Sequence, residues 1–461
     1  MQTRGAQLRA YQFMVRRLTS ALLYGRPNAD NSLRRGVGAV FAGVMVCALM
    51  LAGWATIGLI GLTGPDWRDP NALIVDRDTG SRYVYREGLL HPVLNYASAR
   101  LLLGAASEDV RWVRHSSLAN ERYGPPLGIR DAPDDVPRPA ALIRLPWMIC
   151  RASDPAGAVV SWAVLGEEPS WVNEPLADGV LVVAEEQLYL IWQGNRLKVV
   201  GESGAIRATL GWASVTALPL PEVFVNALPE GPDLVAPAIP GIGENGIPVA
   251  GQETRVGQLF EVQGIRGERQ YYVLLRDGLA AIGGTVLGLL EATGLPGAYE
   301  PNVRIEPTEV AAAELSQVPT STVNLQPPGM PDQPPTLARP DPRNTVLCAR
   351  YAEGSGGQPM WTTHLSDATP VGPELRDSRA PEGVATVDWV QMSGGTGALL
   401  RTADGGVLLV NTQGQRFPVA DRAAQVALGL GDVTPQLIPA GLADALPLGP
   451  TLSVLDADPP A

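Results

Sequence analysis

The pattern of apolar and polar residues divides the chain sharply at its first apolar run. Residues 36 to 65 contain no charged side chain. A helix rises about 1.5 Å per residue and needs about 20 apolar residues to cross the bilayer core, so the pattern predicts one membrane-spanning helix over 37–63. A cleaved signal peptide has a shorter apolar stretch of roughly 7–15 residues, and a buried core helix carries a polar face, so both alternatives fit less well.

A second helix is predicted ahead of this segment, over residues 4–25. Its apolar residues recur at alternating spacings of three and four and so share one face, while three arginines lie off that face. A basic amphipathic helix beside a membrane can lie on lipid or dock on a partner protein. We favour docking, because Tyr11 and Phe13 also suit a protein groove. The partner-docking candidates are Leu8, Tyr11, Phe13, Val15, Arg16, Arg17 and Leu18.

Charge orients the predicted helix. Seven of the 35 basic residues and one of the 47 acidic residues precede the apolar run, which leaves 28 basic and 46 acidic residues for the rest of the chain. Because positive charge stays on the cytoplasmic side, we expect an inner-membrane protein with its N-terminus inside and its bulk outside. An acidic outer region argues against nucleic-acid binding, which needs a basic footprint.

Beyond the span the sequence repeats itself. Residues 215–234 and 433–452 share nine identical residues at one offset, and 187–200 parallels 406–419 after a slip of two residues. Two weaker copies of the first half lie at 81–104 and 269–294. Each copy predicts a strand, a turn at a glycine, a second strand and a helix. The four turn glycines are Gly88, Gly194, Gly278 and Gly414.

A unit this small cannot bury much core alone, so we expect the units to surround a central element. The segments 141–153 and 344–354 read as strands, and each carries one cysteine. In an oxidising compartment Cys150 and Cys348 suggest one disulfide; the alternative is two buried thiols. The predicted fold class is α+β, with one transmembrane helix and an elongated outer region of about four repeats around a disulfide-linked central β core.

These expectations give a domain plan. The ranges are 1–36 for the cytoplasmic basic helix, 37–63 for the transmembrane helix, 64–115 for repeat 1, 116–184 for the first part of the core, 185–250 for repeat 2 and its linker, 251–316 for repeat 3, 317–343 for a Pro-rich extended linker, 344–394 for the second part of the core, 395–455 for repeat 4 and 456–461 for a flexible tail.

Sequence motifs that would indicate a nucleotide, metal or catalytic site are incomplete in this chain. Gly241, Gly243 and Gly246 spell G-x-G-x-x-G, but prolines bracket them where a strand and a helix should stand. The only lysine, Lys198, follows a leucine, so a phosphate-binding Gly-Lys-Ser/Thr loop is absent from the sequence. Three scattered histidines do not suggest a metal site. Asp76 and Asp78 read better as part of a hairpin turn than as a calcium loop. Ser203 lacks a nucleophile-elbow frame.

Several of these stretches together resemble a known family. The helix QLRAYQF at 7–13 with its two following arginines, a single span, DRDTGSRYV at 76–84 and GLLHPVLNYASARLLLG at 88–104 resemble EccB of the actinobacterial type VII (ESX) secretion system. The most specific part is HPVLNYASARL at 91–101, and the resemblance covers essentially the whole chain.

The resemblance implies a structural core subunit of the inner-membrane secretion complex. It implies association with the EccC motor ATPase, EccD, EccE and the mycosin protease, dimeric contacts above the pore, and four repeats around a core bridged by Cys150 and Cys348. Family members are often labelled ATPases, which the missing lysine of a P-loop does not support here.

Three hypotheses follow from the residues. The first is a structural secretion subunit, the second an envelope enzyme that hydrolyses nucleotide at a site other than a P-loop, and the third a cell-wall-binding module. The residues suggest no catalytic, cofactor-binding or metal-binding group, and we expect no cofactor.

Overall fold

The computed structural model describes residues 4–24, 32–60, 67–104, 109–264, 267–300, 303–354, 356–367 and 386–454. The chain forms two units, Met1–Asp69 and Pro70–Ala461, which are described separately. The tail predicted at 456–461 lies outside the described residues.

The smaller unit consists of two helices. Helix α1 (Arg4–Tyr24) confirms the helix predicted ahead of the apolar run. Helix α2 (Ser32–Ile60) carries that run, and its segment Gly36–Ala55 has a mean hydropathy of 2.2. By length and composition α2 can cross a membrane. Residues 61–63 of the predicted span lie outside the described part of the chain.

Among the described residues of the larger unit, four four-stranded sheets share one design. In each sheet three consecutive strands form an antiparallel meander, and a fourth strand joins the first strand in parallel. A parallel return needs a crossover connection, which a helix supplies in each case. We name the units that carry these sheets the first, second, third and fourth repeats.

The strands of the repeats follow. They are β1 (Ala72–Asp76), β2 (Arg82–Arg86), β3 (Leu89–Pro92) and β4 (Asp109–Val113) in the first; β7 (Val180–Ala184), β8 (Gln187–Trp192), β9 (Asn195–Lys198) and β10 (Leu218–Pro219) in the second; β11 (Leu259–Gln263), β12 (Arg269–Leu275), β13 (Gly278–Ile282) and β14 (Thr308–Glu309) in the third; β18 (Ala398–Arg401), β19 (Val407–Val410), β20 (Arg416–Val419) and β21 (Gln436–Leu437) in the fourth.

The helices after the meanders are α3 (Tyr96–Leu103), α5 (Ser203–Thr209), α7 (Gly284–Ala292) and α9 (Arg422–Ala427). Shorter helices are α4 (His115–Leu118), α6 (Glu222–Ala227), α8 (Ala312–Leu315) and α10 (Ala440–Asp444), with a 3-10 turn at Pro139–Ala141.

The predicted repeat unit is thus correct in its middle and incomplete at its ends. All four predicted glycines have the left-handed backbone that a tight turn requires. The pattern missed the first and the last strand of each sheet. Strand β7 pairs with β8, although the domain plan assigns it to the core. Its sequence VLVVA is a continuous apolar run without alternation, which a sheet buried on both faces permits.

The central sheet joins the two cysteine segments. Its order is β16-β15-β5-β6-β17, with β5 (Trp147–Ser153), β6 (Val159–Leu165), β15 (Thr345–Glu353), β16 (Pro359–Asp367) and β17 (Trp389–Met392). Cys150 lies opposite Cys348 in the antiparallel β5–β15 pair, and the two form a disulfide. The α+β class and the disulfide-linked central sheet are confirmed.

The duplicated segments of the second and fourth repeats adopt the same local structure. In the second repeat Gly231 donates its backbone N–H to Arg196 (2.8 Å), and in the fourth Gly449 donates to Arg416 (2.7 Å). Three residues further on, Leu234 bonds to Lys198 and Leu452 to Pro418 in the same way. Helices α6 and α10, one from each repeat, pack against each other over one face of the central sheet.

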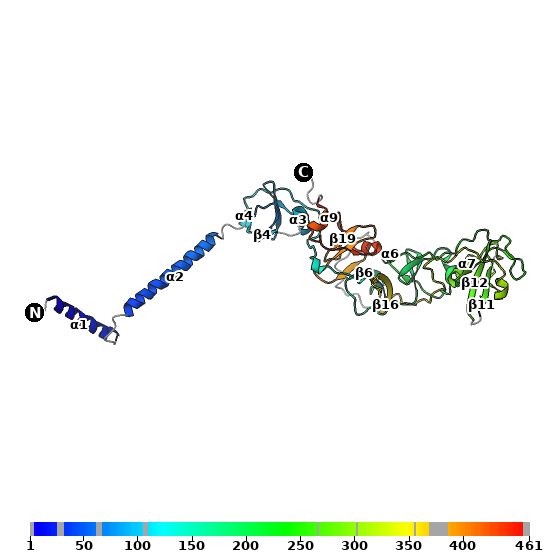
Figure 1. The fold of residues 1–461 in the computed structure, drawn as a ribbon, viewed down its shortest axis with the longest axis horizontal. Helices are drawn as coiled ribbons and strands as arrows, with labels where there is room; N and C mark the ends of the chain where they lie inside the picture. The colour runs from blue at the N-terminus through cyan, green and yellow to red at the C-terminus, as the bar shows by residue number, and fades with distance from the viewer. Residues whose placement is uncertain are drawn as a thin grey trace. The chain divides into compact units, whose positions relative to one another are not determined.

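The outer repeats attach to the inner ones through helix pairs. Helix α3 packs against α9, so that the first repeat lies beside the fourth, as the cyan and red segments show in Figure 1. Helix α7 packs against α5, so that the third repeat lies beside the second. The α3–α9 pair therefore brings together segments more than 300 residues apart in the sequence.

The Pro-rich segment 317–343 contains no helix or strand, as predicted for an extended linker. It is nevertheless packed. Leu325 and Met330 are buried in the apolar core shared by the second and third repeats. Gly179 donates its backbone N–H to Thr336 of this segment (2.8 Å), and Ala338 of the segment donates to Gly179 (2.9 Å). The segment therefore contributes to the core, which its composition alone does not indicate.

A first prediction concerns Gly441, at the crossing of α6 and α10. A Cβ atom at this position would lie 2.1 Å from the backbone oxygen of Asn226. Gly441→Ala must push the helices apart and is expected to destabilise the unit by about 1–3 kcal/mol, measured by thermal unfolding. Gly394→Ala, where a Cβ meets nothing within 4 Å, is the matched control. Equal melting temperatures for the two variants would contradict the crossing.

Candidate interaction surfaces

The N-terminal helix presents its predicted docking residues to its surroundings. In α1 the side chains of Leu8, Tyr11 and Leu18 are 62%, 70% and 59% exposed, and Val15 is also exposed. Large apolar side chains on a soluble surface signal a contact with lipid or protein. The arrangement leaves this face available for such a contact.

Phe13 does not share this face. It stands two positions from both Tyr11 and Val15, and two residues in an α-helix correspond to a rotation of about 200°. Phe13 therefore lies on the side of Arg9, Arg16 and Arg17, opposite the stripe. The predicted docking residues therefore lie on two different faces of the helix, with Phe13 apart from the stripe.

The disulfide lies in an aromatic cluster on the second face of the central sheet. Cys150 and Cys348 are buried with Trp162 and Trp389, whose rings stack at 5.7 Å between centroids. Trp171 packs on Trp162 from the loop that follows β6. Such burial keeps small reductants away from the sulfur atoms while the sheet is folded, so we assign the disulfide a structural role.

The neighbouring residue, Arg151, is a buried cation. Its side chain is fully buried, and burial lowers its pKa to about 10, so it stays protonated at neutral pH. Nε donates to the carbonyl of Pro219 (3.1 Å), and one terminal nitrogen donates to Pro342 and Thr345 (3.1 Å each). Arg151 thus holds two separate segments to β5, one at Pro219 and one at Pro342 and Thr345. The sequence does not mark Arg151, because an arginine in a strand is typical of a surface position.

The three histidines occupy three unrelated places, each with hydrogen-bond partners. His91 Nδ1 donates to Pro125 (3.0 Å) and His364 Nδ1 to Asn173 (2.7 Å). His115 Nδ1 donates to Asp76 (2.8 Å). Asp76 closes the hairpin turn between β1 and β2, which confirms that prediction. Burial alone would raise its pKa, but hydrogen bonds from His115, the Asp78 backbone and Thr79 outweigh burial and lower the pKa to about 2.

The motifs that could suggest nucleotide chemistry lie in ordinary structural positions. Residues 241–246 form turns, and Gly243 packs against the backbone of Gly297. The next helix along the chain is α7, which begins at Gly284. Lys198 ends strand β9, and Ser203 is the first residue of α5.

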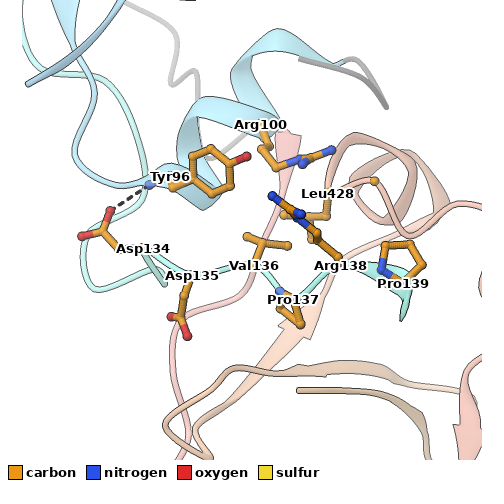
Figure 2. Close-up of a pocket in the computed structure, with 10 residues that line it drawn as sticks. Tyr96, Arg100, Asp134, Asp135, Val136, Pro137, Arg138, Pro139 and Leu428 are labelled. Atoms are coloured by element: carbon orange, nitrogen blue, oxygen red, sulfur yellow. Dashed lines mark hydrogen bonds between the residues drawn. The ribbon is translucent and has the colours of Figure 1, made fainter. Parts of the chain in front are cut away.

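A cleft lies where the first repeat meets the fourth. Its volume is about 360 Å³. Figure 2 shows Tyr96 and Arg100 of α3 above it, Val136, Pro137 and Arg138 of the connecting segment below it, and Leu428 beside them. The wall residues are Tyr96, Arg100, Asp134, Asp135, Val136, Pro137, Arg138, Pro139, Leu428 and Gly429. No sequence motif marks the cleft, because its walls come from segments about 300 residues apart.

The chain is similar to known proteins of one family along almost its whole length. The family model for the type VII secretion system ESX-1 transport TM domain B, EccB, matches residues 1–459. A protein of Mycolicibacterium smegmatis (strain MKD8) named ESX-1 secretion system ATPase EccB1 is 30% identical and is matched over 98% of this chain and 94% of its own length.

Solved structures agree with this match. The chain is similar to one in an intact ESX-5 inner membrane complex, with a TM-score of 0.64, 26% identity and coverage of 99% of this chain and 95% of that one. It also matches a chain in the periplasmic assembly from the ESX-5 inner membrane complex (TM-score 0.62, 25% identity, 84% and 93% covered) and the EccB3 dimer from the ESX-3 core complex (TM-score 0.63, 25% identity, 84% and 99% covered). The chain belongs to the EccB family of the type VII (ESX) secretion system.

Proposed function

We propose that this chain is a structural subunit of an ESX inner-membrane complex, which it scaffolds for protein export. The observation that carries the proposal is the match along almost the whole chain to a subunit of an intact complex of that kind. The architecture supports it: one apolar helix, a large body of repeated sheets, and buried polar groups such as Arg151 that bind backbone rather than face a substrate site.

The proposed orientation places α1 in the cytoplasm and residues 70–461 outside. The arginines before α2 support it, because cytoplasmic flanks carry the excess of basic residues. The disulfide supports it as well, since such bonds persist in oxidising compartments. A similar chain is part of the periplasmic assembly from the ESX-5 inner membrane complex.

Orientation can be tested by cysteine labelling of intact spheroplasts with a membrane-impermeant maleimide. Arg304→Cys, at a side chain that is 89% exposed, is expected to react from outside. Ala6→Cys in α1 is expected to react only after the membrane is opened. The opposite pattern of labelling would overturn the proposed orientation.

The proposed partners are the EccC motor ATPase, EccD, EccE and the mycosin protease, with a second copy of this chain in a dimer. Helix α1 is the proposed docking element on the cytoplasmic side. We also propose that the ranges of the domain plan act as modules of the scaffold, with the second repeat extended to include β7.

Disruption of the α1 stripe should release the chain from its complex. Tyr11→Asp combined with Val15→Asp places two carboxylates on the exposed apolar face, where burial against a partner would desolvate them at a cost of several kcal/mol. Recovery of partner subunits with the tagged chain, measured by quantitative mass spectrometry, is expected to fall by at least about tenfold.

Two controls identify the docking face. Ala10→Asp adds one carboxylate away from the stripe, half the charge of the stripe variant, and is expected to leave recovery nearly unchanged. Phe13→Asp tests the opposite surface. A loss with Phe13→Asp and none with the stripe variant would move the docking site to the arginine-rich side, and no loss with either would remove α1 from the proposal.

ATP hydrolysis is not included in the proposed role. The word ATPase stands in the names of curated relatives and describes those proteins. A P-loop needs the sequence Gly-Lys-Ser/Thr, and the one lysine of this sequence follows Leu197 and is followed by Val199.

A further inference from the structure

Helix α1 has two faces of different chemistry. Its apolar stripe follows spacings of three, four, three and four residues and consists of Leu8, Tyr11, Val15, Leu18 and Leu22. This spacing is typical of the seam between two packed helices, because it keeps a narrow row of apolar side chains in line over two heptads. The stripe therefore suits a helix of a partner protein.

The opposite face combines cations with an aromatic ring. Arg9 and Arg16 are seven residues apart, so they stand in one row about 10 Å apart, and Arg17 lies next to this row. Phe13 lies between them on the side opposite the stripe, and its side chain is 59% exposed. We name these four residues the arginine face.

The arginine face has no carboxylate on its own helix. The sequence of α1 contains no aspartate or glutamate, and residues 1–35 together hold seven arginines and one acid, Asp30. Arg9 Nε donates to the backbone carbonyl of Gly5 (3.2 Å), which leaves its charge in place. Because guanidinium stays protonated at neutral pH, the arginine face carries three positive charges that no acidic side chain of α1 neutralises.

The apolar helix α2 begins a short distance further along the chain. Helix α1 ends at Tyr24 and α2 begins at Ser32 (Figure 1). Eight peptide units span at most about 29 Å, which is close to the length of α1 itself. The uncharged run begins at Gly36, four residues into α2. The headgroup layer of the bilayer that α2 crosses is therefore always within reach of α1.

We propose that the arginine face binds anionic lipid headgroups while the stripe contacts a partner protein. Paired N–H groups of guanidinium bind phosphate oxygens, so phosphate headgroups complement Arg9, Arg16 and Arg17. The Phe13 ring enters the acyl boundary while the longer arginine side chains reach the headgroups. Clusters of basic residues directly beside a membrane-spanning helix are typical of anionic-lipid recognition. The other arrangement, with the stripe in the lipid, would turn the three arginines away from the phosphates.

The lipid contact can be tested on the full chain alone in lipid nanodiscs. The inference rests on the proposed function only in giving the stripe a protein partner, and no partner is present in this experiment. In a Cys47→Ala background, an environment-sensitive nitrobenzoxadiazole fluorophore is attached at Ala6→Cys or at Leu8→Cys. These positions are two residues apart and so lie on opposite faces, the first on the side of Phe13 and the second in the stripe.

The two probes should respond differently to lipid charge. In nanodiscs that contain phosphatidylglycerol, we expect the probe at residue 6 to shift its emission to the blue and to be shielded from aqueous iodide. The probe at residue 8 should remain in water. Phosphatidylcholine alone should shift neither probe, and added salt should reverse the shift at residue 6 because it screens the attraction.

Arginine variants measure the contribution of the charges. Arg16→Gln combined with Arg17→Gln should lower the ratio of lipid-bound to free α1 by roughly 25-fold, about fivefold for each charge. Arg4→Gln is the matched control, since Arg4 is in line with Tyr11 on the stripe side of the same helix. Its charge lies across the helix, about a Debye length from the lipid, so a loss of less than about twofold is expected. Glutamine preserves the helix in each case.

Each contrary result overturns the proposal. A blue shift at residue 8, alone or together with one at residue 6, would assign the lipid to the stripe. Equal shifts in phosphatidylglycerol and phosphatidylcholine would remove lipid charge from recognition, and equal losses per charge with Arg4→Gln and the double variant would show attraction without a preferred face. No shift at either probe would remove the lipid contact. None of these results affects the proposed scaffold, because recovery of partner subunits and spheroplast labelling test that role separately.

Discussion

Replacement of Arg151 by alanine is expected to lower the free energy of unfolding of the larger unit by about 3–5 kcal/mol. The change removes three charge-assisted hydrogen bonds to the part-buried carbonyls of Pro219, Pro342 and Thr345, of which only Pro342 is known to keep another side-chain donor, the Ser153 hydroxyl. An unsatisfied buried polar group costs roughly 1–3 kcal/mol, and the cavity adds to it. For a unit of this size the loss corresponds to a fall in melting temperature of roughly 5 °C.

Two further variants separate the causes. Arg151→Met fills most of the volume and still lacks the donors, so an intermediate loss is expected if the hydrogen bonds matter. Arg304→Ala, at an exposed arginine, is expected to shift the melting temperature by less than about 1 °C. A loss with Arg151→Ala that is no greater than this control would contradict the role of Arg151 in holding these two segments to β5.

Loss of the Cys150–Cys348 disulfide is the second large effect. The bond closes a loop with a sequence separation of 198, and the loop-entropy relation gives about 5 kcal/mol at most. Cys150→Ala combined with Cys348→Ala should therefore lower the melting temperature by up to roughly 6 °C. Alanine is chosen for both positions so that no thiol or hydroxyl is buried without a partner.

Burial of the disulfide adds a second readout. Both cysteines are at most 1% exposed beneath Trp162 and its neighbours. Dithiothreitol followed by alkylation should label neither cysteine in the folded protein and both after unfolding in denaturant. A structural role for the bond would be ruled out by rapid labelling under native conditions, or by a double variant with the same melting temperature as the wild type.

How far the sequence predicts this molecule depends on how local each feature is. Helices α1 and α2, the four glycine turns and the two cysteine strands follow from short-range patterns, and the structure contains them. The sequence places β7 with the core, because a continuous apolar run does not show which strand it pairs with. It places Leu325 and Met330 in a linker, because nothing in a Pro-rich segment indicates that these two residues are buried.

The features that the sequence does not show are not local. Arg151 is recognisable as a clamp only once Pro219, Pro342 and Thr345 surround it. The cleft exists only because α3 meets α9 across the fold. A single sequence shows the residues of each wall but not that they lie together.

The chain is proposed to scaffold an ESX inner-membrane complex. The most direct test is purification of the tagged chain from native membranes in mild detergent, followed by mass spectrometry and size analysis of what co-elutes. We expect the tagged chain to elute in a megadalton-scale assembly that contains the motor ATPase EccC and the polytopic EccD. Recovery of the chain alone, or with cell-wall fragments only, would contradict the scaffold role.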